Sequence, residues 1–320
     1  MKLVRYCPAK SRKCGRLGIL VERPDGLHVL DVARARAWAF PTSRYAPIPN
    51  DVLPLLRSWA KSLDMLRRVL DAALRRWDAL PFGVAVPLAQ VRLEEPIARP
   101  GKIICPGLNF RKHLEETKGL SAKPPEMPLA FLKAPSSVVG PEEAIVMPPW
   151  TQKLDYEVEL AAVIGVGGTG IRPEDALRHV AGYTILNDVS AREVQVAEMK
   201  AGFLTLGKNF PTSCPMGPYL LTADELPDPH VLSMELRVNG EIRQRGHTSD
   251  LIFDFAALIA YWSRMGLEPG DVITSGTPSG VALGREPDTS WYLKPGDVVE
   301  ATIERLGTLR NPVAAPTAAG

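Results

Sequence analysis

Short apolar runs, interrupted by glycine and proline, dominate the chain and predict many strands joined by turns. Two such runs, 15–21 and 27–31, flank a Pro24-Asp25-Gly26 turn and predict a hairpin near the N-terminus. Further strands are expected at 102–105, 129–133, 143–147, 154–165, 183–187, 217–222, 232–238, 272–275 and 297–305. This pattern predicts an α+β, strand-rich fold.

Helical spacing of apolar residues is confined to a few segments. Between 51 and 78, leucines and tryptophans recur every three or four residues with basic residues between them, which predicts an amphipathic helix with a solvated basic face. A short helix is expected after Asn109, as its cap, and Gly119 would end it. Two more helices are expected at 173–182 and 250–265.

A proline- and glycine-rich stretch around Pro96, Pro100 and Gly101 predicts a domain boundary. Residues 1–97 are expected to form a small N-terminal α/β domain, in which no catalytic pattern is visible. Residues 98–320 are expected to form a larger, strand-rich domain. A chain of 320 residues is long enough to bury a sizeable core.

Charge and cysteine content narrow the class of protein. With 38 Lys+Arg against 36 Asp+Glu, the net charge of +2 is too balanced for a protein that binds nucleic acid or a membrane surface. No apolar stretch approaches the ~20 residues of a membrane span, and the N-terminus lacks the apolar core of a signal peptide. Four cysteines without CxxC spacing predict reduced thiols and a cytoplasmic location, although Cys7 and Cys14 could pair or bind a metal.

Acidic residues interrupt the strand pattern at two places. Glu157 and Glu159 lie two positions apart in the 154–160 run, so on a strand both would point to one face. Asp188 follows the apolar run 183–187, where a loop could direct it back toward this pair. Converging carboxylates repel one another unless a divalent cation lies between them, and an all-oxygen set suits Mg²⁺, Mn²⁺ or Ca²⁺ better than zinc. A solvated strand face is the alternative interpretation.

Other candidate groups lie on the short helix and in three polar loops. His113 and Glu116 are three positions apart, on one helix face, where the carboxylate could hold the imidazole ready to take a proton from water. An exposed surface pair is the alternative. The segments 188–195, 207–210 and 274–281 could present cations, amides or hydroxyls to an anionic ligand, or could be plain loops.

Taken in order, these segments resemble the fumarylacetoacetate hydrolase family. The resemblance runs from about residue 100 to 313, while the first hundred residues match only loosely. It depends on seven motifs, which lie at 102–110 (with His113 and Glu116), 131–137, 154–160, 181–192, 207–208, 268–273 and 275–281.

The resemblance implies a mixed β-sandwich roll for the catalytic domain, a homodimer and a bound Mg²⁺ or Mn²⁺ ion, with Ca²⁺ as an alternative. It places the ion on Glu157, Glu159 and Asp188. It also implies that His113 and Glu116 form a water-activating dyad on a helix that orders as a lid.

The resemblance further implies a set of groups that contact the carboxylate and oxo oxygens of a 2-oxo acid substrate or lie beside it: Lys208, Gln195, Thr277 and Arg192. Two positions depart from the family pattern. Phe110 stands where many relatives have tyrosine, which removes a hydroxyl near the lid. Pro211 stands where relatives often carry an aspartate, so the resemblance does not predict which groups contact Lys208 from behind.

The expected reaction is hydrolysis of a C–C bond in a 2,4-dioxo acid of the acylpyruvate or fumarylpyruvate type. The metal would stabilise the departing enolate, His113 and Glu116 would activate water, and Lys208 would hold developing negative charge. The alternatives within enzymes are a decarboxylase, tautomerase, isomerase or hydratase of a 2-oxo dioate such as oxaloacetate or a ring-cleavage product. The alternative from another class is a metal- or ligand-binding protein without turnover.

Overall fold

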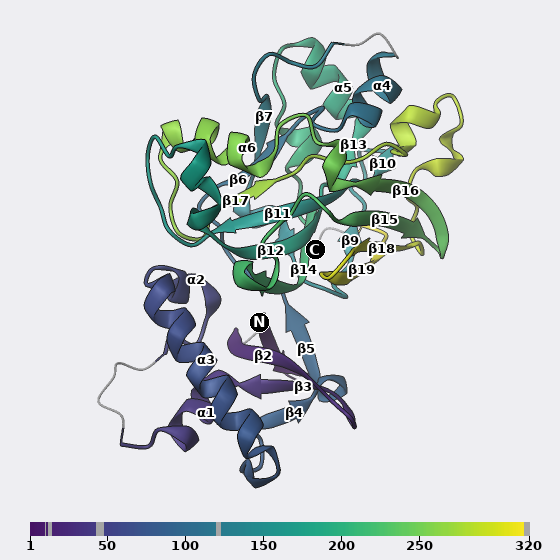
Figure 1. The fold of residues 1–320 in the computed structure, drawn as a ribbon. Coiled ribbons are helices and arrows are strands. Elements are labelled where there is room, and N and C mark those ends of the chain that lie inside the picture. The colour runs from purple at the N-terminus through teal and green to yellow at the C-terminus, as the bar shows by residue number, and fades with distance from the viewer. Residues whose placement is uncertain (10, 12–14, 43–47, 120–122, 317–320) are drawn as a thin grey trace.

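The chain forms a strand-rich structure with short helices (Figure 1). The computed structural model describes residues 1–9, 11, 15–42, 48–119 and 123–316. Its sheets contain antiparallel pairs together with parallel ones, such as Val272↔Ile103 and Val313↔Ile145. The α+β, strand-rich class expected from the sequence is therefore confirmed.

The largest sheet in the described part of the chain has 12 strands. Its main path runs β4 (Ala85–Pro87), β3 (Gly26–Asp31), β2 (Arg16–Arg23), β1 (Lys2–Pro8), β14 (Cys214–Thr222), β12 (Val180–Asn187), β11 (Val158–Ile164), β17 (Val272–Thr274), β6 (Ile103–Pro106) and β7 (Ala130–Lys133). Two strands lie off this path: β5 (Val91–Glu94) pairs with β1, and β8 (Val138–Val139) pairs with β14. β11 is therefore an inner strand, flanked by β12 and β17.

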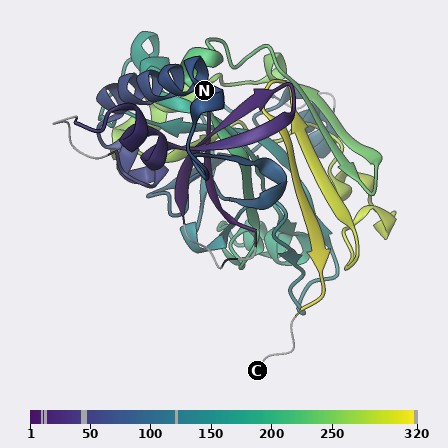
Figure 2. The ribbon, with the colours of Figure 1, turned by 90° about the horizontal axis from the view of Figure 1, so that it is seen from below.

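A second, five-stranded sheet packs on the large one and closes a sandwich. Its order is β16 (Glu241–His247), β15 (Ser233–Val238), β18 (Val298–Ile303), β19 (Gly307–Ala314) and β9 (Ile145–Val146). Figure 2 shows β18 and β19, in yellow, running beside the strands of the large sheet. β15 and β18 contact β11, and Leu160, Leu236 and Ala301 share one apolar core. A separate pair, β10 (Leu154–Asp155) and β13 (Ser190–Ala191), lies next to the start of β11.

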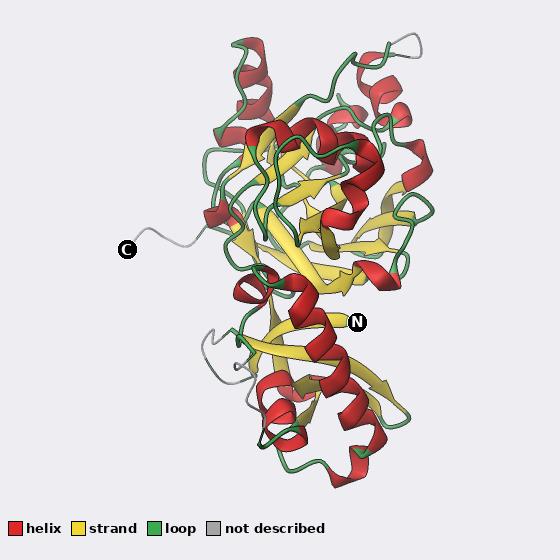
Figure 3. Cartoon of the chain, turned by 60° about the vertical axis from the view of Figure 1, so that its left-hand side comes forward, coloured by secondary structure: helices red, strands yellow, loops and turns green. Residues whose placement is uncertain are grey.

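The helices surround these sheets without forming a layer of their own. They are α1 (Val32–Ala39), α2 (Val52–Leu56), α3 (Trp59–Arg75), α4 (Arg111–Lys118), α5 (Arg192–Lys200) and α6 (Phe255–Trp262). In Figure 3, α3 lies along the strands of the N-terminal part, onto which it buries Leu66 and Val69. The helix expected at 51–78 is thus two helices, α2 and α3, separated at Arg57 and Ser58.

The expected boundary at residue 97 falls between β5 and β6, and the two sides of it share a sheet. β1 pairs with β14 through Lys2↔Leu221 and Leu3↔Leu220. One apolar cluster also combines residues from both sides, including Leu3 and Val163. The division into residues 1–97 and 98–320 stays a prediction.

Several predicted elements differ from the observed ones. The strand expected at 154–165 is interrupted at Tyr156 and Glu157, because β10 pairs with β13 while β11 pairs with β12 and β17. The helix expected at 173–182 is a 3₁₀ helix over Pro173–His179, and its last three residues belong to β12. β16 and β19 were not expected, since they carry polar residues on their outer face and lack a continuous apolar run.

Asn109 does not cap α4. The helix begins after Phe110, which makes no side-chain cap, and ends at Gly119 as expected. The Asn109 amide instead donates to the carbonyl oxygens of Phe253 (3.0 Å) and Ser275 (2.8 Å), and its oxygen accepts from the Phe253 N–H (2.9 Å). Asn109 therefore ties the start of α4 to the 275–281 loop.

Two further sequence expectations concern cysteines and membranes. Cys105 and Cys214 are free and buried, whereas Cys7 takes part in a disulfide, so the expectation that all thiols are reduced is wrong at Cys7. Cys14 lies outside the described residues. Within those residues, every helix is too short or too polar to cross a membrane.

Candidate active site

Three buried carboxylates meet where β11 begins and β12 ends. Glu157 immediately precedes β11, Glu159 lies within it, and Asp188 follows β12. Antiparallel pairing of these strands aligns Val158 with Asn187, and the Asp188 N–H donates to the Glu157 carbonyl oxygen (2.8 Å). Each of the three side chains offers an oxygen within 4.8 Å of the others. The structure thus brings together the three residues that the sequence predicts to be metal ligands.

Positive side chains compensate part of this negative charge. The Lys208 ammonium donates to Glu157 Oε2 (2.9 Å) and Asp188 Oδ2 (2.6 Å). Burial opposes ionisation of Glu157, but the charges of Lys208 and Arg192 hold its pKa well below the usual range. Burial, together with the charges of Asp188 and Glu157, raises the pKa of Glu159.

The donor set fits a divalent cation. Glu159 Oε2 is buried and has no hydrogen-bond partner among the described residues. An unpartnered carboxylate oxygen beside two other carboxylates is unfavourable unless a proton or a cation neutralises it. Carboxylate oxygens are ligands of Mg²⁺, Mn²⁺ and Ca²⁺, so these residues could hold such an ion.

The predicted His–Glu pair lies on α4, which covers this site. His113 Nδ1 is 3.1 Å from Glu116 Oε2, and both side chains are largely buried. Glu116 Oε1 accepts the Gly280 N–H (2.9 Å), which fixes the helix to the 275–281 loop. The His113 side chain is an electrostatic neighbour of Glu157, so it lies near the carboxylates. With Nδ1 held by Glu116, Nε2 is the nitrogen left for proton transfer.

The predicted substrate-contacting groups surround the carboxylates from α5 and from the 275–281 loop. Arg192 and Gln195 lie one turn apart on α5, and Arg192 donates to Gln195 Oε1 (2.7 Å) and to Glu157 Oε1 (2.5 Å). The Thr277 hydroxyl donates to the Val158 carbonyl oxygen (3.0 Å) and accepts from Gln244 (2.9 Å). This hydroxyl would have to leave Val158 before it could donate to a substrate oxygen.

Sequence reasoning assigned no role to two buried charges. The Lys133 ammonium donates to Asp188 Oδ1 (2.7 Å) and to the Lys208 carbonyl oxygen (2.5 Å). Asp155 accepts from Arg192 Nε (2.7 Å) and from the N–H groups of Ala282 (2.9 Å) and Leu283 (3.0 Å). Both lie inside apolar strand segments, and a charge in such a segment is a signal of a buried partner.

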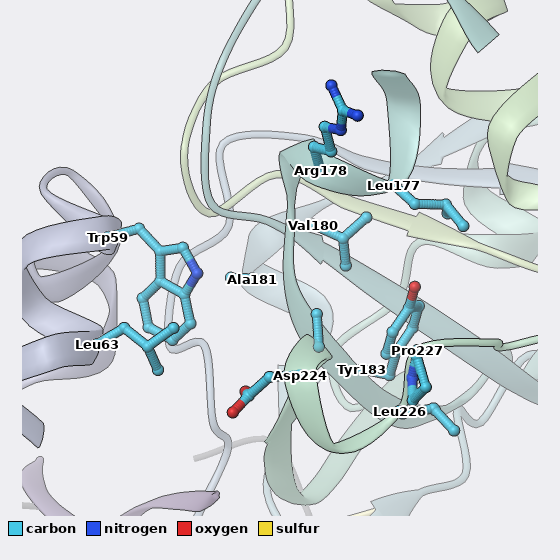
Figure 4. Close-up of a pocket in the computed structure, with 11 residues that line it drawn as sticks. Trp59, Leu63, Leu177, Arg178, Val180, Ala181, Tyr183, Asp224, Leu226 and Pro227 are labelled. Atoms are coloured by element: carbon cyan, nitrogen blue, oxygen red, sulfur yellow. The ribbon is translucent and has the colours of Figure 1, made fainter. Parts of the chain in front are cut away.

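A separate cleft of about 350 Å³ lies between α3 and the part of the chain that follows residue 97, called the catalytic part below (Figure 4). Trp59 and Leu63 line it from α3, while Tyr183 and Leu226 line it from the other side. It contains none of the carboxylates, the His–Glu pair or the substrate-contacting candidates described above. This cleft is therefore distinct from the candidate active site.

Comparison with known proteins assigns the chain to a family. Residues 102–314 match the model of the fumarylacetoacetate (FAA) hydrolase C-terminal domain. An oxaloacetate tautomerase, fahd2, mitochondrial, of Xenopus laevis is 45% identical over 315 residues, which cover 98% of this chain and 90% of the relative.

Solved structures support the same assignment. Fumarylacetoacetate hydrolase from Exiguobacterium antarcticum has a TM-score of 0.75 and 34% identity, over 99% of this chain and 100% of that one. Maleylpyruvate hydrolase from Sphingobium sp. SYK-6, in complex with manganese(II) and pyruvate, has a TM-score of 0.74 and 31% identity over the same shares. The fold is the one these structures have, and the buried acidic triad together with the manganese complex supports a divalent metal site. The chain is an enzyme of the fumarylacetoacetate hydrolase family.

Proposed function

We propose that this enzyme is a divalent-metal-dependent tautomerase that interconverts the enol and keto forms of a 2-oxo dioate, with oxaloacetate as the substrate. The observation that carries the proposal is the buried His113–Glu116 pair beside three converging carboxylates. Support comes from the relative named oxaloacetate tautomerase, which aligns with nearly the whole chain. This choice replaces C–C hydrolysis, which the sequence favoured, with the alternative that the relatives support better.

A metal ion held by Glu157, Glu159 and Asp188 would draw electron density from the 2-oxo group and so acidify the hydrogens at C3. Mg²⁺ and Mn²⁺ are the ions we propose. In the keto-to-enol direction, His113 Nε2 takes a proton from C3 while the oxygen at C2 gains one from solvent. The imidazolium then releases its proton to solvent, which restores the base. In the reverse direction, the imidazolium gives a proton to C3, the enol hydroxyl proton leaves to solvent and the imidazole takes up a proton again, so no atom is gained or lost over the cycle.

The other polar groups would orient the substrate and hold its charge. Glu116 keeps the His113 imidazole in one tautomer through Nδ1. Lys208 and Arg192 carry the positive charges that would face the carboxylates and the enolate oxygen of the substrate. Gln195 and Thr277 would supply the neutral contacts that select a planar 2-oxo acid.

Hydrolysis of a C–C bond is the second candidate. The same imidazole could deprotonate water instead of C3, and the neighbour with bound manganese and pyruvate is named a maleylpyruvate hydrolase. Decarboxylation would need the same electron sink but no attacking water. A homodimer and a cytoplasmic location also remain proposals, and the Xenopus relative is itself named mitochondrial.

The test is a tautomerase assay on freshly dissolved enol-oxaloacetate, followed by loss of enol absorbance. We expect Mg²⁺ or Mn²⁺ to support turnover, EDTA to abolish it and added metal to restore it. Pyruvate release from oxaloacetate and from acylpyruvates is measured in the same samples. Metal-dependent pyruvate release without faster enol loss would replace the tautomerase proposal with a lyase or hydrolase, and no metal-dependent turnover of any substrate would reject both.

A further inference from the structure

A carboxylate outside the site holds the turn that carries Lys208. Glu198, on α5, accepts the N–H groups of three successive residues: Thr205 (2.9 Å), Leu206 (2.7 Å) and Gly207 (3.0 Å). These three residues lead directly into Lys208, and the short 3₁₀ helix Leu206–Lys208 includes two of them. The carboxylate thus takes up three backbone donors that a turn would otherwise leave to solvent.

Close packing joins the same two segments a second time. A Cβ on Gly207 would lie 2.6 Å from the Gln195 backbone nitrogen and 2.7 Å from its Cα. Backbone atoms of a helix cannot move aside cheaply, so only glycine allows the turn to approach α5 this closely. Gly207 and Glu198 therefore fix the turn against α5 at two separate points.

We infer that Glu198 is a positioning residue that sets Lys208 at a fixed distance from Arg192 and Gln195, so that the three groups meet a 2-oxo acid together. The inference rests on the proposed function. Arg192, Gln195 and Glu198 belong to one helix, whereas Lys208 belongs to the turn that follows it. Lys133, Glu157 and Asp188 hold Lys208 from the other side, whereas Glu198 joins its turn directly to α5. Loss of this link would let the turn shift relative to the helix, and misplacement of a contact by about 1 Å is enough to weaken substrate positioning strongly.

The ionised state of Glu198 suits this role. Its partial burial works against ionisation, but the N–H groups of Thr205, Gly207 and Leu206 lower its pKa overall. Because the side chain remains partly exposed, replacing it removes the clamp without opening the core.

The same helix offers a matched control. Glu193 also accepts three donors, from the Thr151 hydroxyl (2.6 Å), the Gln152 N–H (2.8 Å) and the Lys153 N–H (3.2 Å). Those donors belong to the 151–153 segment, which does not carry Lys208. Glu193→Gln therefore weakens a comparable set of contacts of α5 and leaves the Lys208 turn untouched. The backbone bond from the Arg192 N–H to the Lys153 carbonyl oxygen (3.0 Å) remains in this variant.

The experiment measures pyruvate binding to the Mn²⁺-loaded full-length protein by calorimetry, so it does not depend on turnover. We expect Glu198→Gln and Gly207→Ala each to weaken pyruvate binding about tenfold, because charge-assisted contacts lose their geometry. Glu198→Asp, which keeps the charge on a shorter side chain, should give an intermediate loss. Glu193→Gln should bind pyruvate within about twofold of wild type, and Mn²⁺ affinity should stay within about threefold throughout.

Unchanged pyruvate affinity in folded Glu198→Gln protein would overturn the inference, and so would an equal loss in Glu193→Gln. If Glu198→Gln does not fold, Gly207→Ala and Glu198→Asp decide between the same outcomes. If wild-type protein binds pyruvate with Mn²⁺ but does not accelerate enol loss, the tautomerase proposal is rejected. The pyruvate affinities of the variants then still decide whether Glu198 positions Lys208. Wild-type protein that binds no pyruvate would overturn the inference.

Discussion

Two fully buried carboxylates, one in each part of the molecule, have opposite surroundings. Asp31, in the N-terminal part, accepts from the Tyr6 hydroxyl (2.6 Å), the Arg34 N–H (2.9 Å) and the Arg16 guanidinium (2.5 Å). Glu159, in the catalytic part, has one oxygen without any hydrogen-bond partner in the described structure. A buried carboxylate that has all its partners is tolerated within a fold, whereas one that lacks a partner is costly unless a proton or a cation neutralises it. The presence of hydrogen-bond partners therefore distinguishes a structural carboxylate from a candidate metal ligand more clearly than burial does.

The largest expected effect comes from Glu159→Gln. Loss of a metal ligand should lower metal-dependent turnover at least about a hundredfold. The metal-free protein should be as stable as wild type or more so, because an unpaired buried carboxylate is removed. Activity assays and thermal unfolding in EDTA test both halves, and a large loss of metal-free stability would show that Glu159 has a structural role like that of Asp31.

Asp31→Asn should give the opposite result. Replacing the carboxylate weakens its contacts with Tyr6 and Arg16, so we expect the free energy of unfolding to fall by about 3 kcal/mol. Turnover per folded molecule should stay close to that of wild type. Denaturant unfolding measures the stability, and assays of enol loss on the same samples measure turnover. A variant that keeps full stability but loses turnover would contradict the structural role of Asp31.

Lys133→Met tests an intermediate case, because it creates a second unpartnered carboxylate oxygen among Glu157, Glu159 and Asp188. Asp188 Oδ1 would lose its ammonium partner, so the metal-free protein should be less stable by about 2 kcal/mol. Mn²⁺ should restore part of the melting temperature, since the cation supplies positive charge at the same carboxylate. No such rescue is expected for Asp31→Asn, and equal behaviour of the two variants would contradict the distinction.

The smallest effect concerns pH and Glu198, a partly exposed carboxylate with all its partners. Its folded-state pKa is lowered, so its contribution to stability is complete above the unfolded value of about 4.3 and is lost as pH falls through the folded value. The stability difference between wild type and Glu198→Gln should therefore shrink below about pH 4. Solvent screening keeps this difference small, and a difference that grows on acidification would reverse the assigned sign.

The sequence predicts the convergence of Glu157, Glu159 and Asp188 because strand alternation and apolar neighbours are local properties. It does not predict the interruption at Glu157, which depends on how β10 pairs with β13. The same limit applies to Asn109, whose amide bonds to Phe253 and Ser275, more than a hundred residues away. Partners at such separations are set by tertiary packing and leave no trace in local spacing.

Two buried charges at the candidate active site also have partners that local spacing does not predict. Lys133 and Asp155 lie within motifs that the family resemblance includes, yet their partners come from other segments of the chain. Spacing therefore identifies the acidic triad and the His–Glu pair, whereas the network that holds them becomes visible only when the sheets are assembled.

The pairing of β1 with β14 constrains any exchange of the N-terminal part between relatives. β14 uses one edge for β1 and the other for β12, the strand that leads into Asp188. A donor segment without a matching first strand would expose backbone donors and acceptors along that edge and invite pairing between molecules. Chimeras in this family should therefore preserve two junctions. One is the loop near residue 97, and the other is the pairing of β1 with β14.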